Sequence, residues 1–218
     1  HFTQFDASPL ILNPANTGAF NGDWRASVVY RDQWRSIAGN SAFKTYAASF
    51  DMPIIRDISV DDYLAGGVQL YNDRAGDGNL TNFSALLSVA YQKFLGEDAR
   101  KVLTVGLQGG YSQKSIDWSR LYFENEFDEG QWNPGINPDR NFLGTGDGYF
   151  VINAGISYAQ AVSDNFSFTV GAGVNNINQP LETFDTREKS VDVGLGMRYT
   201  GQLGAIIQVG DRFALKPA

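Results

Sequence analysis

The sequence contains no cysteine, which excludes disulfide bonds and thiolate metal sites. Its one histidine is His1, so no other imidazole can serve a Ser-His or histidine-assisted mechanism. No run of eighteen apolar residues occurs, which excludes a transmembrane helix. With 17 Lys and Arg against 24 Asp and Glu, the chain also lacks the dense cationic surface that nucleic acid requires. We expect no catalytic residue, cofactor, metal site or nucleic-acid partner.

What is present favours β-strands. Of 218 residues, 24 are glycine, 13% are aromatic and 19% are charged, a profile typical of many glycine-punctuated strands. The first expected strand covers residues 23–35. One face carries Trp24, Ala26, Val28 and Tyr30, and the other carries Arg25, Ser27, Val29, Arg31, Gln33 and Arg35. Alternation at period 2 over this length is typical of strands that span a membrane.

Similar segments recur along the chain. Further strands are expected at residues 42–51, 62–72, 80–95, 101–116, 149–160, 166–176, from 190 to about 208 with a bulge at Gly201, and from about 213. Apolar residues alternate with small or polar ones, as the two faces of a membrane barrel require. The sequence therefore predicts an all-β, antiparallel transmembrane β-barrel over residues 23–218, and a soluble β-sandwich is the alternative.

The links between the expected strands alternate in length. Short links at 96–100, 162–165 and 209–212 are separated by long ones at 117–148 and 177–189. Bacterial barrels place tight turns on the periplasmic side and long loops outside, so this order predicts a periplasmic N-terminus. Residues 1–22 show no period, and we expect an extended periplasmic lead-in that either plugs the barrel or lies against its rim. The link at 52–61 is long for a periplasmic turn.

The strand count has a consequence for closure. Nine strands is an odd number, whereas single-chain bacterial barrels are even. The last residues, Leu215-Lys216-Pro217-Ala218, lack a terminal aromatic side chain. An open edge in lipid leaves backbone groups unpaired, which is costly. We therefore expect further C-terminal strands beyond these 218 residues.

Several motifs, in order along the chain, resemble the PorP/SprF family of Bacteroidota proteins. One position departs from the family pattern, because Asn176 stands where histidine is usual. The motifs are His1-Phe2-Thr3-Gln4-Phe5, Leu12-Asn13-Pro14-Ala15-Asn16-Thr17-Gly18, Tyr30-Arg31-Asp32-Gln33-Trp34, Phe50-Asp51-Met52-Pro53-Ile54, Leu70-Tyr71-Asn72-Asp73-Arg74-Ala75-Gly76, Asn176-Ile177-Asn178-Gln179-Pro180 and Asp211-Arg212-Phe213-Ala214-Leu215-Lys216-Pro217. The residues we carry over as family-motif positions are Asn13, Pro14, Gly18, Asn72, Asp73, Asn178, Gln179 and Pro180.

The resemblance implies a barrel of about fourteen strands in the outer membrane of a Gram-negative Bacteroidota bacterium. Its implied role is in type IX secretion or gliding motility, where it exports or anchors large surface adhesins through their C-terminal domains. The implied partners are outer-membrane lipid, the adhesin or its C-terminal domain, other type IX components and a periplasmic peptidoglycan-binding protein.

Three sets of residues are candidates for binding. Arg25, Arg31 and Arg35 form a basic stripe on one strand face, which either binds an acidic cargo or, in the favoured interpretation, pairs with carboxylates in the lumen. Asp73, Asp77 and Asn79 offer oxygen ligands for calcium but lack EF-hand spacing, so a solvated turn is favoured. The link at 117–148 is the strongest candidate for partner binding, because exposed aromatic side chains dominate interfaces. Its aromatic residues are Trp118, Tyr122, Phe123, Phe127, Trp132 and Phe142. A lid over the barrel mouth is the alternative for this link.

Three other functions compete with adhesin export. A fatty-acid channel of the FadL type has similar size and an N-terminal plug, but it needs an apolar channel, whereas the inward residues here are mostly polar. A barrel lipase or protease lacks its histidine base. The recurring glycines at 106, 109 and 110 lack the following helix of a dinucleotide-binding motif, so we expect them to permit close packing inside the barrel.

Overall fold

One antiparallel sheet dominates the protein. The structure is a computed structural model that describes residues 7–56, 58–59, 61–96, 99–128, 130–137, 144, 146–182, 194–209 and 213–215. The sheet has nine strands, and each pairs with its neighbours along the chain. They are β1 (Arg25–Gln33), β2 (Phe43–Ile55), β3 (Tyr63–Ala75), β4 (Leu80–Leu95), β5 (Lys101–Ser115), β8 (Gly148–Ser163), β9 (Phe166–Asn175), β10 (Arg198–Val209) and β11 (Phe213–Leu215). The predicted all-β antiparallel architecture is confirmed.

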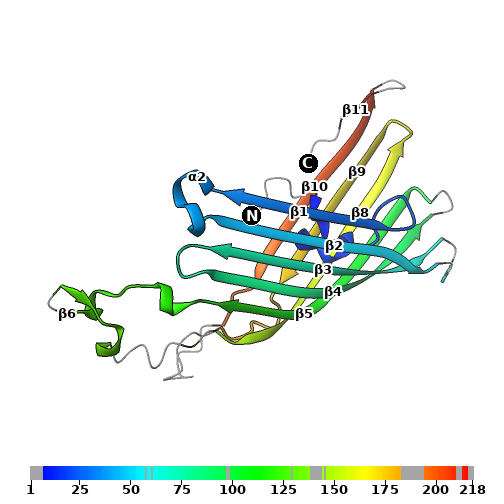
Figure 1. The fold of residues 1–218 in the computed structure, drawn as a ribbon. Coiled ribbons are helices and arrows are strands. Elements are labelled where there is room, and N and C mark those ends of the chain that lie inside the picture. The colour runs from blue at the N-terminus through cyan, green and yellow to red at the C-terminus, as the bar shows by residue number, and fades with distance from the viewer. Residues whose placement is uncertain are drawn as a thin grey trace.

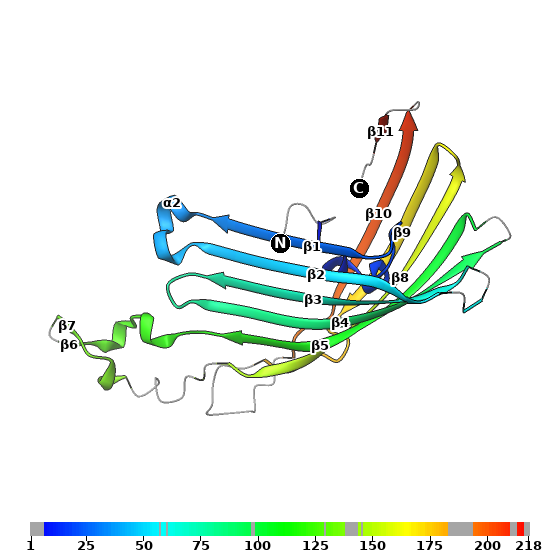
Figure 2. The ribbon, with the colours of Figure 1, turned by 45° about the vertical axis from the view of Figure 1, so that its right-hand side comes forward.

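The sheet curls into the shape of a half-barrel (Figures 1 and 2). Within the described residues, β1 and β11 are its two edges. Its convex face is apolar and exposed, as at Leu87, which is 68% exposed, and at Leu107 and Phe150. Its concave face is polar and buried, with side chains that include Thr45, Gln69, Ser88, Gln92, Thr104, Gln108, Ser112, Asn153 and Ser157. This inside-out polarity is what a strand needs when lipid replaces water outside the sheet.

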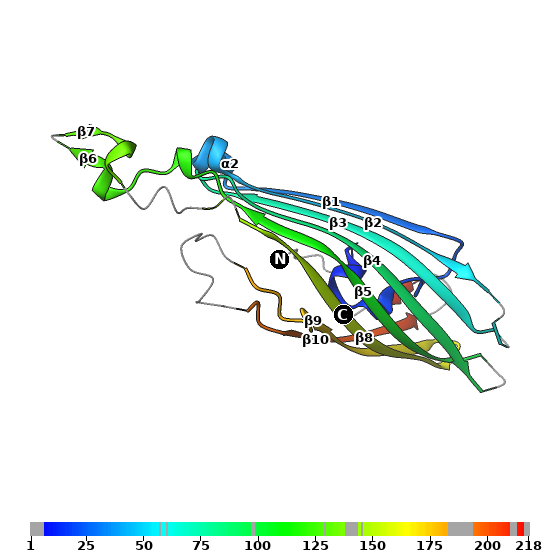
Figure 3. The same ribbon diagram turned by 90° about the horizontal axis from the view of Figure 1, so that it is seen from below.

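From residue 96 onward short and long links alternate, as predicted for that half of the chain, whereas the link at 76–79 is shorter than the one at 56–62. At one end lie the links at 56–62, 96–100, 164–165 and 210–212, and at the other lie those at 34–42, 76–79, 116–147 and 176–197. The link at 34–42 contains α2 (Arg35–Ala38) and η3 (Gly39–Ser41). The link at 116–147 contains η4 (Trp118–Arg120), η5 (Glu124–Glu126), β6 (Phe127–Asp128), β7 (Gln131–Trp132) and η6 (Pro134–Ile136). Figures 1 and 3 show β6 and β7 projecting beyond the end of the sheet, on the same side as α2.

The structure corrects four local predictions. Residues 7–22 are not simply extended, because they contain α1 (Pro9–Leu12) and η2 (Pro14–Asn16). β10 begins at Arg198 rather than 190, and residues 190–193 lie outside the described residues. Its pairing with β9 runs through Gly201 without a bulge, since Thr200, Gly201 and Gln202 keep the strict alternation of the strand. β2 also continues to Ile55, which shortens the link that seemed too long for a tight turn.

No helix among the described residues is long and apolar enough to cross a membrane.

Candidate functional site

Residues 7–22, which we call the N-terminal segment, lie against the concave face of the sheet. Figure 3 shows α1 and η2 inside the curve of the sheet rather than beyond its end. Leu10, Asn13, Ala15 and Thr17 are almost completely buried there. The segment is therefore packed within the half-barrel, between β2 to β5 on one side and β8 to β10 on the other.

Two prolines and an asparagine explain the local fold of the N-terminal segment. Pro9 and Pro14 each occupy the start of a short helix, where the missing proline N–H costs no hydrogen bond. The Asn13 side chain caps η2, because its Oδ1 accepts a hydrogen bond from Ala15 N at 2.9 Å. A period-based search cannot find helices of three or four residues, since they complete one turn at most.

Asn13 also ties the N-terminal segment to β8 and β9. Its Nδ2 donates to Ile156 O and to Ala172 O, both at 3.2 Å. Thr200 of β10 donates to Leu12 O at 2.9 Å. Asn16 and Gln202 of β10 exchange two side-chain hydrogen bonds at 2.9 and 3.1 Å. These contacts join the segment to the last three long strands of the sheet.

On the other side, the N-terminal segment is joined to β3 and β4. Thr17 and Ser88 share a hydrogen bond of 2.9 Å between their hydroxyl oxygens. Gln92 donates to Thr17 O at 3.2 Å, and the Tyr63 hydroxyl donates to Gly18 O at 2.9 Å. The backbone carbonyls of the segment are thus satisfied by strand side chains, as buried carbonyls require.

A buried ion pair fixes the end of the N-terminal segment. Asp51 is 0% exposed, and it accepts two hydrogen bonds from Arg25 at 3.0 and 2.7 Å and one from Gly18 N at 2.7 Å. Arg25 also donates to Asn16 O at 2.8 Å and lies over the Phe20 ring. The buried carboxylate therefore has three donors, which offsets the cost of removing it from water.

Glycines in the sheet make room for the N-terminal segment. A Cβ at Gly106 would lie 2.4 Å from the Pro14 carbonyl carbon, and one at Gly155 would lie 1.8 Å from Asn13 Oδ1. Gly18 needs a different freedom, because its φ of +70° disfavours other residues and a Cβ there would meet Ala65 Cβ at 2.2 Å. We predicted that the glycines at 106, 109 and 110 permit close packing inside the barrel. At Gly106 this packing partner is the backbone of the N-terminal segment.

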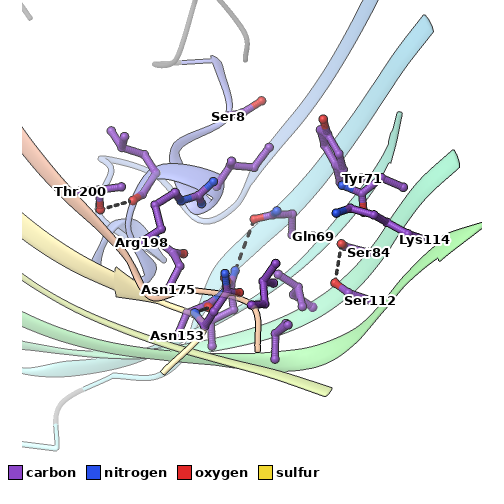
Figure 4. A pocket seen from close by; sticks show the side chains of 18 of the residues that line it. Ser8, Gln69, Tyr71, Ser84, Ser112, Lys114, Asn153, Asn175, Arg198 and Thr200 are labelled. Atoms are coloured by element: carbon purple, nitrogen blue, oxygen red, sulfur yellow. Dashed lines mark hydrogen bonds between the residues drawn. The ribbon is translucent and has the colours of Figure 1, made fainter. Parts of the chain in front are cut away.

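A cavity of about 500 Å³ lies on the concave face beside the N-terminal segment (Figure 4). Ser8, Ile11 and Leu12 of the segment line it. Its strand residues lie near the strand ends that the long links join, and its cations are Arg31 on β1, Lys114 on β5 and Arg198 on β10. Amides, hydroxyls and a few apolar side chains form the rest: Thr45, Gln69, Tyr71, Asn82, Ser84, Leu86, Gln108, Ser112, Tyr149, Val151, Asn153, Asn175, Asn176, Leu195 and Thr200.

The link at 116–147, which we call the long loop, folds around one buried carboxylate. Glu126 is 0% exposed and accepts hydrogen bonds from Trp132 Nε1 at 2.9 Å, Asn137 Nδ2 at 3.0 Å and Phe123 N at 3.3 Å. The Tyr122 and Trp132 rings pack edge to face with centroids 4.8 Å apart. The long loop therefore has a small core of its own.

The predicted aromatic residues divide into two groups. Trp118 and Phe123 are half-buried and pack together, and Trp118 donates to Gly144 O at 2.8 Å. Tyr122 is 67% exposed, and Phe127 and Trp132 are also exposed. Phe142 lies outside the described residues. Among its described residues, the exposed aromatic side chains of the long loop are thus Tyr122, Phe127 and Trp132.

The three arginines predicted as one stripe are separated by the structure. Arg25 is paired with Asp51 beneath the N-terminal segment, and Arg31 lines the cavity. Arg35 belongs to α2 rather than β1, and its guanidinium lies 3.6 Å from Asp32. The stripe ends at β1, because Trp34 adopts a left-handed backbone conformation that breaks the strand alternation.

The motif positions have distinct structural roles. Asn178 Nδ2 donates to Phe150 O at 2.7 Å and its Oδ1 accepts from Ile152 N at 3.0 Å, so the amide replaces a strand neighbour beyond the end of β9. Gln179 has a positive φ and Pro180 is buried. Asn72 is exposed on β3, while Asp73 accepts a hydrogen bond from Thr45.

The oxygen ligands considered for calcium are used elsewhere. Asp77 accepts from Ser41, and Asn79 accepts from Arg74 Nε at 2.7 Å. Within the described part of the chain, no group of three or more His, Asp or Glu side chains is placed to hold a metal ion.

Sequence reasoning missed the two carboxylates on which these regions depend. Asp51 appears in the sequence only as part of a family motif, and Glu126 is one of several acidic residues in a long link. The direct cross-strand pairing of Arg25 with Asp51 follows from the register of β1 and β2, which could have been tested as a charge pair at this position. Nothing in the local sequence distinguishes Glu126 from the exposed Glu124.

Comparison with known proteins agrees with this geometry. The model of one family, described as type IX secretion system membrane protein PorP/SprF, matches residues 1–218, the whole chain. Neither the search of curated proteins nor that of solved structures gives a match. The family match covers the half-barrel, the N-terminal segment and the long loop together, so the chain belongs to the PorP/SprF family of type IX secretion system membrane proteins.

Proposed function

We propose that this protein acts in the outer membrane, where it exports or anchors large cell-surface adhesins through their C-terminal domains. The observation that carries the proposal is the placement of exposed aromatic side chains. Tyr122, Phe127 and Trp132 lie on the long loop, beyond the end of a sheet whose concave face holds the N-terminal segment. Exposed aromatic residues of this kind favour a protein partner over a solute.

The orientation is part of the proposal. With the short links on the periplasmic side, the long loop and α2 face the cell exterior, and the N-terminal segment acts as a plug between the two compartments. The hydrogen bonds to β3, β4, β8, β9 and β10 support a plug that stays in place while a partner binds outside. Other type IX secretion components are expected partners, and a periplasmic peptidoglycan-binding protein would meet the short-link side.

A channel for a small apolar solute is less well supported. The described part of the concave face carries buried amides and hydroxyls, including Gln69, Gln92, Gln108 and Asn153, and the cavity contains three cations. Transfer of an apolar solute past such groups would leave their hydrogen bonds unmet.

Affinity purification from native outer membranes in mild detergent tests the proposal. The wild-type protein should recover a large surface protein through its C-terminal domain. The variant F127S, which leaves the Tyr122–Trp132 packing and the hydrogen bond from Trp132 to Glu126 in place, should recover clearly less of it, because an exposed aromatic contact is gone. The matched control I37S removes an exposed apolar residue from the link at 34–42, at the same end of the sheet, and should retain it. Recovery of bound lipid without a surface protein would favour the channel.

A further inference from the structure

The cavity of about 500 Å³ has a charge imbalance among its described residues. Arg31, Lys114 and Arg198 contribute cationic groups, and no Asp or Glu is among the described residues that line it. The three cations come from β1, β5 and β10, so they surround the cavity rather than forming a run on one strand. A buried or half-enclosed set of like charges is stable only when anions balance it.

A carboxylate already rests against one side of this cavity. Lys114 Nζ lies 2.7 Å from Glu182 Oε1 and 3.0 Å from its Oε2. The Tyr149 hydroxyl donates to the same Oε2 at 3.5 Å. Glu182 belongs to the link after β9. Lys114 and Tyr149 on this side of the cavity therefore bind a carboxylate that a loop supplies.

On the neighbouring strands, donors remain without a carboxylate. Asn175 on β9 is 4% exposed, and its Nδ2 has no hydrogen-bond partner in the part of the chain that the structure describes. A buried donor without an acceptor is uncommon and costs free energy. Arg198 follows on β10, paired in register with Asn175, and makes no ion pair with the described residues. In Figure 4 both residues lie on the side of the cavity away from Lys114 and Tyr71.

The position of the cavity indicates the direction from which a ligand enters. Its strand residues cluster at the ends joined by the long links, and Ser8, Ile11 and Leu12 of the N-terminal segment line it from within the half-barrel. A ligand would therefore arrive from the side of the long loop and meet the N-terminal segment. A volume of about 500 Å³ suits a short peptide rather than a folded domain.

We propose that this cavity binds an acidic peptide segment of the exported protein, with a carboxylate held by Arg198 and the Asn175 amide. The inference rests on the proposed function for the identity of its partner. The peptide carboxylate supplies the acceptor that Asn175 lacks and a counter-ion for Arg198, while Glu182 continues to pair with Lys114.

Calorimetric titration of the full chain in detergent tests the ligand class. The probes are N-acetyl-triglutamate amide and the isosteric N-acetyl-triglutamine amide, with acetate and inorganic phosphate as small anions. Triglutamate should bind with an affinity that falls as salt rises, and triglutamine should bind at least about tenfold more weakly. Equal affinity for the two peptides would overturn the proposal. Tighter binding of acetate or phosphate than of triglutamate would overturn its assignment to a peptide.

Two variants locate the binding groups. R198Q should weaken triglutamate binding about tenfold, because one charge-assisted hydrogen bond is lost. The control R100Q removes the same charge from a half-exposed position at the short-link end and should bind normally. N175L should bind more weakly than wild type without losing thermal stability, since the amide it removes has no partner to lose. Normal binding by R198Q, or lower stability with unchanged binding in N175L, would contradict the assignment.

Recovery of the surface protein from membranes separates the two proposals. If wild-type protein recovers its surface protein but does not bind triglutamate, the cavity proposal fails and the proposed function stands. If triglutamate binds through Arg198 but no surface protein is recovered, the ligand class stands and the proposed function fails.

Discussion

The N-terminal segment and the long loop are both irregular regions held by a buried carboxylate, but the carboxylate belongs to the sheet in the first case and to the loop itself in the second. Both are irregular in sequence, and both depend on a fully buried carboxylate. Asp51 comes from β2 and joins the N-terminal segment to β1, whereas Glu126 receives hydrogen bonds from within the long loop. The first region is part of the sheet's interior, and the second is a separate unit attached to its end.

This difference predicts where the effect of a substitution will be felt. A change that releases the N-terminal segment uncovers polar side chains on β3, β4, β8, β9 and β10 together, so the whole half-barrel should lose stability. A change within the long loop exposes a small core that the sheet does not share. Stability measured on the sheet and on the loop should therefore respond independently.

The largest effect is expected for D51A. Removal of the buried carboxylate leaves Arg25 and Gly18 N without their acceptor, which should cost about 3–5 kcal/mol of unfolding free energy. Urea unfolding of the folded protein in detergent, followed by tryptophan fluorescence, measures it. D164A removes an exposed carboxylate that pairs with Arg100 and should change stability by less than about 1 kcal/mol. A D51A protein as stable as D164A would show that the segment is not integral to the sheet.

G106A comes next. The added methyl group would meet the Pro14 and Ala15 backbone, which has to move, at a cost of about 1–3 kcal/mol. The matched control is G201A, where a methyl group would meet nothing within 4 Å. Resistance of the folded protein to heating in detergent should fall for G106A only. Equal resistance to heating in the two variants would mean that the N-terminal segment does not pack against Gly106.

E126Q sharpens the comparison from the side of the long loop. All of the hydrogen-bond partners identified for Glu126 are donors, and glutamine offers only one carbonyl oxygen to them. The long loop should lose about 1–3 kcal/mol of local stability, and limited proteolysis within residues 117–137 should accelerate. The unfolding midpoint of the sheet should stay unchanged. E124Q, at an exposed neighbour, is the control, and a lowered midpoint in E126Q would show that loop and sheet are coupled.

The smallest effect concerns pH at the short-link end. Hydrogen bonds from the Tyr91 hydroxyl and Phe94 N hold the pKa of Asp62 below its ordinary value of 3.8. A lowered pKa means that Asp62 stabilises the folded state above its ordinary pKa, and that this contribution is lost as the pH falls through the lowered value. Protection of the Phe94 amide, measured as its exchange rate relative to the intrinsic rate at the same pH, should fall below about pH 4 in the wild type. In D62N this protection should change little with pH, whereas D23N should follow the wild type.

The strands were predictable because their physics is local. β4 was expected at 80–95 and β5 at 101–116, and their observed bounds are 80–95 and 101–115. Each side chain of these strands faces either lipid or the interior, so alternation alone fixes the strand and its faces. β2 was underestimated at its end, where Pro53 and a register shift near Ile55 interrupt the pattern.

The sites were less predictable because their partners are distant in sequence. Asn13 is recognisable as a motif residue, but its acceptors Ile156 and Ala172 are defined only by the curl of the sheet. The arginine stripe was predicted from one strand. That Arg25 pairs with an aspartate depends on β2, and that Arg31 lines a cavity depends on strands as distant as β10. No sequence pattern marks Asn175 as a buried side-chain amide whose Nδ2 lacks a hydrogen-bond partner among the described residues.

The contacts of Leu12 and Asn13 have a consequence for how the protein is made. Their hydrogen bonds reach residues 159 and 188 positions further along the chain, so the N-terminal segment is secured only by strands that follow it at long sequence separation. Contacts of such sequence separation form slowly, because a long loop must close before they are gained. Until β9 and β10 are in place, the N-terminal segment lacks the hydrogen bonds that these strands provide, so we expect its docking to be a late step in assembly.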